Sequence, residues 1–128
     1  MIPHDLNWKQ LVVLDLATED EYWLNELAAD MVIREVLPSM VRDGLVEIRC
    51  FGDPVDPSST DELLGDDRNW NLPAISFFAT DVGRESYFAL DTEKLTRLWR
   101  QALNDGYPNA ASRSGGLVSR SDHPKADT

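Results

Sequence analysis

The stretch from Tyr22 to Phe51 constrains the fold more than any other part of the chain. It contains two segments with apolar residues at helical spacing, followed by one segment in which apolar and polar residues alternate. The first segment follows Thr18, a good helix-capping residue, and three acids that suit the first turn of a helix. Its apolar stripe is Trp23, Leu24, Leu27, Ala28 and Met31. The spacing predicts a helix here.

The second helical segment contains a proline. Its apolar stripe is Ile33, Val36, Leu37, Met40 and Val41. Pro38 lacks an amide donor and crowds the preceding turn, so we expect the helix to begin near Arg34 or Glu35, which places the proline in the first turn. Asp43-Gly44 should end it, because glycine readily takes the left-handed conformation after a helix.

Strands are expected at three places after this helix. Residues 45–51 alternate, with Val46, Ile48 and Cys50 on the side that should face the core. Residues 74–79 and 85–90 predict a hairpin, in whose connection Gly83 would supply a positive φ angle.

Capping residues mark the two outer helices. Asn7, with Gln10 three residues later, forms a capping-box pattern, although the apolar run 11–14 also fits a strand. Asp91 should cap a last helix with the apolar face Leu95, Leu98, Trp99 and Ala102. From Pro108 on the chain is rich in Ser, Gly and charge, so we expect one domain over residues 1–107 and a disordered tail over 108–128.

The order of these elements resembles a winged-helix domain with an added C-terminal helix, an α+β fold. The resemblance implies DNA binding by the third helix, through Arg34 and Arg42, with Arg84 in the turn of the wing. Winged-helix proteins often dimerise through terminal helices, and Leu103 and Tyr107 are candidates for such a contact. A DNA-binding regulator is therefore one hypothesis for this chain.

The charge of the chain favours a different partner. The net charge is −11 and the sequence pI is about 4.4, which opposes binding to DNA, RNA or anionic lipid and favours cationic partners. A simpler interpretation is that acidity keeps a small protein soluble. From Arg34 to Arg49 the acids and arginines cancel, so the expected DNA-binding helix has no positive footprint.

No pattern of catalytic residues is present in the sequence. His4 and His123 lie near the termini, no His/Cys set has zinc spacing, and neither a Gly-rich phosphate loop nor a Gly-x-Ser-x-Gly motif occurs. The single cysteine, Cys50, excludes an internal disulfide and fits a core position. We expect no enzyme, cofactor or metal, no membrane span, and a cytoplasmic location.

The segment from Gly52 to Pro73 is the candidate binding site. We expect a long irregular loop, in which Trp70 and the apolar pair Leu63-Leu64 lie among acidic residues. The candidate contact residues are Asp53, Asp56, Asp61, Glu62, Asp66, Asp67 and Trp70. Carboxylates would steer a basic partner and Trp70 would anchor it, unless the loop is merely solvated and Trp70 lies in the core.

The composition is similar to that of small acidic bacterial immunity proteins, which neutralise basic nuclease-type toxins. That likeness implies a module that neutralises or adapts a cationic protein, or inhibits an enzyme of nucleic acid by placing carboxylates where phosphates would bind. Our principal hypothesis is therefore non-enzymatic protein binding, and the alternative is the DNA-binding regulator.

Overall fold

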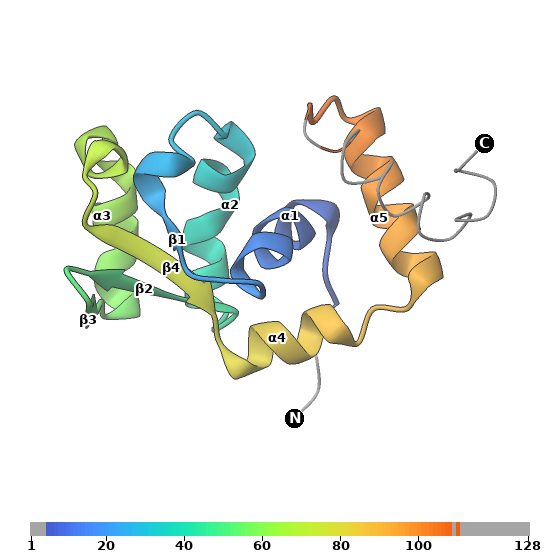
Figure 1. Ribbon diagram of the computed structural model, residues 1–128, viewed down its shortest axis with the longest axis horizontal. Helices are drawn as coiled ribbons and strands as arrows, with labels where there is room; N and C mark the ends of the chain where they lie inside the picture. Colours follow the sequence, from blue (N-terminus) through green and yellow to red (C-terminus); the bar gives the residue numbers. More distant parts are fainter. Residues whose placement is uncertain (1–4, 109, 111–128) are drawn as a thin grey trace. The chain divides into compact units, whose positions relative to one another are not determined.

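A computed structural model describes residues 5–108 and 110 (Figure 1). The chain divides into two compact units, residues 1–89 and residues 90–128. The described part of the first unit contains a small antiparallel sheet and four α-helices, and that of the second contains α5 (Thr92–Asn104). The expected α+β class is confirmed. No helix among the described residues has the length and apolar character needed to cross a membrane.

Helix α1 (Trp8–Ala17) begins at the predicted capping box. The Asn7 side chain accepts a hydrogen bond from the Gln10 amide, and the Gln10 side chain accepts one from the Asn7 amide. The two bonds satisfy donors that have no partner within the helix. The strand alternative for residues 11–14 is therefore wrong.

Helix α2 (Met31–Arg42) confirms the second predicted helix but begins earlier than expected. The Asp30 carboxylate accepts hydrogen bonds from the Val32 and Ile33 amides, and this cap sets the start. Pro38 therefore lies inside the helix rather than in its first turn. A fully buried face stabilises the helix despite the missing hydrogen bond: Ile33, Leu37 and Met40. Gly44 has the predicted positive φ, +76°.

The sheet has the strand order β1-β4-β2-β3, and every pair is antiparallel. Its central strands are β2 (Val46–Cys50) and β4 (Ile75–Ala79), as predicted. The edge strands β1 (Tyr22–Trp23) and β3 (Asp53–Pro54) are two residues each. Helices α1 and α2 pack against the sheet face that carries Val46, Ile48, Ile75 and Phe77. This face and the two helices form the core of the first unit.

The helix predicted after Thr18 is wrong. That stretch forms β1, which pairs with β4, and then a single 3-10 turn, η1 (Leu24–Glu26). Leu24 is fully buried, but Trp23 and Met31 from the same expected stripe are 39% and 67% exposed. The apolar residues at helical spacing therefore do not form one buried face. Pairing with the open edge of β4 decides the structure instead.

The strand predicted over residues 85–90 is also wrong, and so is the hairpin. After β4 the chain forms helix α4 (Asp81–Phe88), capped by the Thr80 hydroxyl, which accepts a hydrogen bond from the Gly83 amide at 3.1 Å. Gly83 lies in this helix and does not supply a positive φ. An added Cβ at Gly83 would lie 2.0 Å from the Leu45 carbonyl oxygen. The glycine is needed for close approach, not for a turn.

The segment expected to be an irregular loop contains short elements. After β3 come η2 (Pro57–Ser59), helix α3 (Thr60–Gly65) and η3 (Asp67–Asn71). Trp70 in η3 is fully buried, and its indole nitrogen donates to the Leu64 carbonyl oxygen at 2.9 Å. This buried ring fixes the segment to the body of the first unit.

In the second unit, α5 begins at the predicted cap, where the Asp91 carboxylate accepts from the Lys94 amide. Leu98, Trp99 and Ala102 are buried, and Gly106 follows the helix with a φ of +86°. The tail predicted to be disordered lies outside the described residues, apart from Pro108 and Ala110.

Candidate functional site

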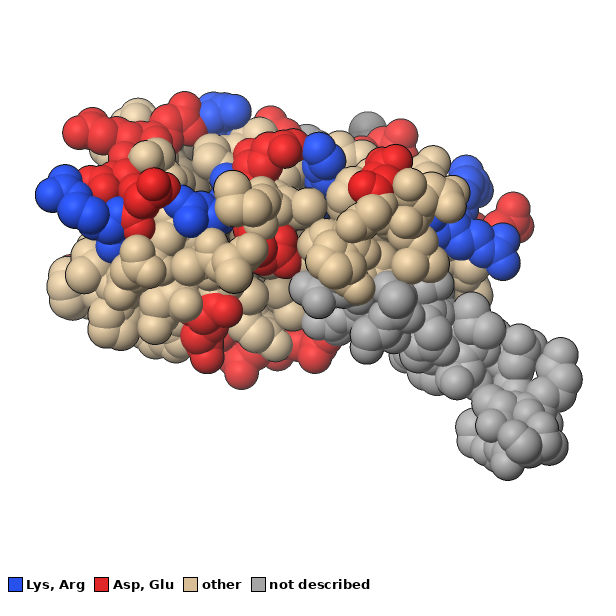
Figure 2. Space-filling model, turned by 90° about the horizontal axis from the view of Figure 1, so that it is seen from above, with Lys and Arg blue, Asp and Glu red and all other residues tan. Residues whose placement is uncertain are grey.

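The acidity of the chain is concentrated in the first unit. Residues 1–89 carry eighteen carboxylates and six lysines or arginines, a net charge of −12, whereas residues 90–128 carry +1. Five of the six cations form ion pairs: Lys9–Glu35, Arg34–Asp67, Arg42–Asp61, Arg49–Glu47 and Arg68–Asp66. On the face that Figure 2 shows, acidic and basic side chains lie among one another, including at the end where α3 lies. The excess charge on this unit is entirely negative.

Arg34, proposed above as a DNA contact, is enclosed by its own chain. Its guanidinium pairs with Asp67, donates to the Ala28 carbonyl oxygen at 3.2 Å and lies 5.1 Å from the centre of the Trp70 ring. Its side chain is only 23% exposed. Arg34 therefore links the start of α2 to η3.

The other two candidate DNA contacts are also engaged. Arg42 in α2 pairs with Asp61 of α3. Arg84 lies in α4 rather than in the turn of a wing, and its guanidinium donates to the Thr18 carbonyl oxygen at 3.1 Å. With Arg34, all three arginines thus have partners within the protein. The segment from Gly52 to Pro73, called the acidic segment below, therefore neutralises the arginines of α2, the helix that the winged-helix resemblance assigns to DNA.

Two of the candidate carboxylates order the acidic segment itself. Asp56 accepts from the amide and hydroxyl of Ser58, and Asp66 accepts from the guanidinium and amide of Arg68. These hydrogen bonds favour the ionised forms, so the pKa of each carboxyl is lowered from its ordinary value. The stabilisation they give is present at neutral pH and is lost as the pH falls through the lowered pKa values.

Asp53 and Glu62 are the candidate carboxylates with no partner among the described residues. Asp53 lies on the edge strand β3 and Glu62 in the first turn of α3, and both are exposed. Of the seven predicted contact residues these two are the most available to a cation outside the protein. Asp61 and Asp67 are exposed as well, but each already holds an arginine of α2.

Trp70 is not available as a contact residue. It is fully buried, so the expectation of an exposed aromatic anchor is wrong. The alternative, a tryptophan in the core, is confirmed. The side chains that sequence reasoning missed lie at the two ends of the segment. Phe51 is 79% exposed and Leu72 is 43% exposed. The signal for Phe51 is its place before Gly52, which leaves a two-residue turn between Cys50 and Asp53.

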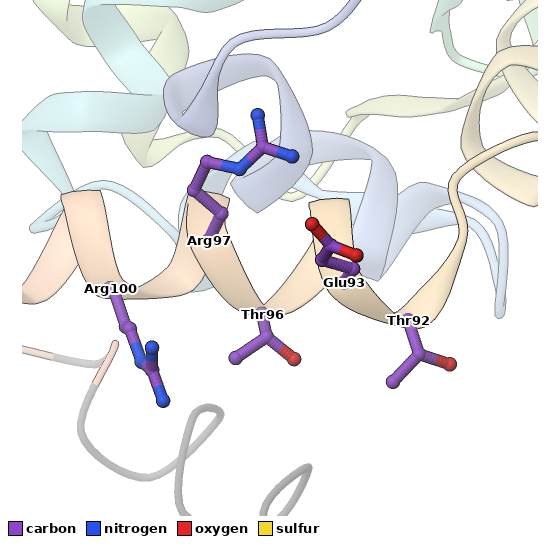
Figure 3. Close-up of a pocket in the computed structure, with 5 residues that line it drawn as sticks. All are labelled: Thr92, Glu93, Thr96, Arg97 and Arg100. Atoms are coloured by element: carbon purple, nitrogen blue, oxygen red, sulfur yellow. The ribbon is translucent and has the colours of Figure 1, made fainter.

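A pocket of about 560 Å³ lies along α5 (Figure 3). It is lined by Thr92, Glu93, Thr96, Arg97 and Arg100. Arg97 and Arg100 point in different directions in this view, so their charges do not converge on one anion. Among residues 5–108 and 110 no group of three or more His, Cys, Asp or Glu side chains is arranged to hold a metal.

Comparisons with known proteins give no relative to which this geometry can be compared, because no family model, curated protein or solved structure matches the chain.

Proposed function

We propose that this protein binds a basic protein partner through the acidic surface of its first unit, without catalysis. The observation that supports the proposal most is the charge balance. A net charge of −12 lies on residues 1–89, and every lysine and arginine of that unit already contacts a group of the protein itself. Such a surface attracts cationic partners over distances of about 10 Å at moderate salt.

A neutralising or adapting role follows from this chemistry. Carboxylates that lie on ordered elements keep their positions when a partner arrives, so little conformational freedom is lost on binding. Asp53 and Glu62 would form new ion pairs, while Asp61 and Asp67 would add to the field without leaving α2. A cytoplasmic location remains a prediction of the sequence.

The winged-helix likeness is part of the proposal only for the order α1, α2, β2 and β4. The expected second helix is replaced by β1 and η1, and the second strand of the expected hairpin is replaced by α4. DNA binding by α2 would require Arg34 and Arg42 to leave Asp67 and Asp61.

Glu62→Lys should slow association with the partner about threefold to tenfold at low salt, because the substitution places a positive charge on the binding surface. The partner would be recovered by affinity capture from a lysate, and its association rate measured at several salt concentrations. The slope of rate against salt should also become shallower.

The matched control is Glu85→Lys. Glu85 is an exposed glutamate of α4 without a partner among the described residues, so the substitution changes the net charge by the same amount away from the acidic segment. It should alter the association rate less than twofold. Equal effects of the two substitutions would show that only net charge matters and would contradict a localised acidic site.

A further inference from the structure

The turn between β2 and β3 has a residue that its backbone disfavours. Cys50 pairs with Asp53, so the connection consists of Phe51 and Gly52 alone. Both have positive φ angles, +53° and +84°, as the central residues of a type I′ turn do. Asparagine or glycine is preferred at the first of these positions, because other side chains are strained there. A phenylalanine at this position costs stability.

Packing does not compensate for this strain. Phe51 is 79% exposed, the largest exposure of any bulky apolar side chain among the described residues. Its amide donates to the Ala74 carbonyl oxygen at 2.8 Å, a bond that any residue at this position could make. Strained backbone that the fold does not require is often found where a protein binds something.

Two more exposed apolar side chains lie at the same end of the sheet. Phe51 is opposite Ala74, which follows Leu72 by two residues at the start of β4. Trp23 pairs with Ser76 on the other side of β4. Trp23 and Leu72 are 39% and 43% exposed. We call Trp23, Phe51 and Leu72 the apolar end of the sheet.

Unpaired carboxylates flank the apolar end. Asp53 follows the strained turn directly, and Glu26 lies in η1, three residues after Trp23. Both are exposed and have no partner among the described residues. Arg49 of the neighbouring strand β2 is paired with Glu47 and lies 4.3 Å from the centre of the Phe78 ring. The surface therefore combines apolar contact area with uncompensated negative charge.

We propose that the apolar end of the sheet is the docking surface for the basic partner, with Phe51 as its aromatic anchor. The inference rests on the proposed function and adds to it the chemistry of the partner: a cationic segment that presents arginine or lysine next to an apolar side chain. The apolar side chain contacts Phe51 and Leu72, and the cations pair with Asp53 and Glu26. The helices α2 and α3 supply the surrounding field.

The test uses two synthetic peptides and the full-length protein. In one peptide arginines flank a tryptophan, and in the other alanine replaces that tryptophan. Each is titrated at low salt into isotopically labelled protein, and amide shifts are followed by NMR. The tryptophan peptide should bind about tenfold more tightly than the alanine peptide and should shift the amides of Phe51, Asp53 and Trp23.

Phe51→Asn should remove the preference for the tryptophan peptide, while binding of the alanine peptide stays within twofold. Because asparagine suits the turn, this variant should have a higher Tm, so the loss cannot come from misfolding. The control is Phe88→Asn, which removes another exposed aromatic residue of the first unit, 65% exposed, and should leave the preference unchanged.

Equal binding of the two peptides, or a preference that survives Phe51→Asn, overturns the docking surface and leaves the proposed function standing. Failure of both peptides to bind at low salt overturns the docking surface and the acidic binding site together.

Discussion

Replacing Trp70 by alanine should destabilise the protein by about 3–5 kcal/mol, the largest loss we expect from any truncation of a side chain in the acidic segment. The ring is fully buried, and its indole nitrogen donates to the Leu64 carbonyl oxygen at 2.9 Å. The substitution leaves a cavity and an unpaired carbonyl, and removes the ring beside which Arg34 lies. Since small domains are stable by only about 5–15 kcal/mol, much of the stability would be lost.

Urea denaturation followed by circular dichroism measures this loss. Trp70→Phe is the control, because it keeps most of the apolar volume and should cost about 1–3 kcal/mol for the lost donor. Tryptic cleavage after Arg68, whose side chain is 88% exposed, should accelerate in Trp70→Ala as the segment separates from the body. A loss below about 1 kcal/mol with unchanged cleavage would show that the ion pairs hold the segment instead.

The ion pairs are not expected to do so. Arg42–Asp61 is an exposed pair, with side chains 52% and 62% exposed, and such pairs contribute about 0–1 kcal/mol. Arg34–Asp67 is more enclosed on the arginine side, but Asp67 is 85% exposed. Burial of Trp70 therefore holds the segment in place, and the ion pairs set the charge that it presents.

Gly83→Ala should also destabilise the protein severely, by more than about 3 kcal/mol. The new Cβ would lie 2.0 Å from the Leu45 carbonyl oxygen and 3.2 Å from a methyl group of Leu14. The Leu45 oxygen accepts a hydrogen bond from the Thr80 amide at 3.1 Å, so it cannot move away without breaking the junction between β4 and α4. Helix α4 would have to leave its position.

Gly65→Ala is the matched control for this substitution. Gly65 ends α3, its φ is not positive, and nothing lies within 4 Å of an added Cβ. The control should be neutral or stabilising by up to about 1 kcal/mol, since alanine restricts the unfolded chain more than glycine does. Thermal denaturation of both variants gives the comparison. Similar Tm values for the two would contradict the close approach of α4 to Leu45.

The elements that the sequence predicted correctly are those with local signals. The caps Asn7 and Asp91 and the terminal glycine Gly44 act within a few residues of their own position. The strands β2 and β4 combine β-branched or aromatic residues with turn residues at their ends. These features do not depend on the rest of the fold, so one sequence suffices to find them.

The two wrong elements depend on distant parts of the chain. Tyr22 and Trp23 form a strand because β4, more than fifty residues later, has an open edge beside them. Gly83 is required in α4 because the helix lies close to the Leu45 carbonyl oxygen, where a side chain would not fit. Thr80 with Asp81 is a helix-capping signal, but the apolar residues after Gly83 favoured the prediction of a strand. Local spacing could not decide either case.

The candidate site was predictable in its charge but not in its geometry. Net charge is a sum over the sequence and needs no structure. The pairs Arg42–Asp61 and Arg34–Asp67 join residues 19 and 33 positions apart, and the sequence gives no sign of them. The sequence left open whether Trp70 is exposed or buried, because its burial depends on where the acidic segment folds back.

Binding of a basic protein is tested most directly by affinity capture from the native host lysate at low and at high salt, with and without nuclease. We expect one basic protein in stoichiometric amount, released in part by high salt and retained after nuclease treatment. Recovery of nucleic acid that nuclease removes would contradict this expectation and would assign Arg34 and Arg42 to DNA instead. A bound protein that is neutral or acidic, and insensitive to salt, would also contradict it.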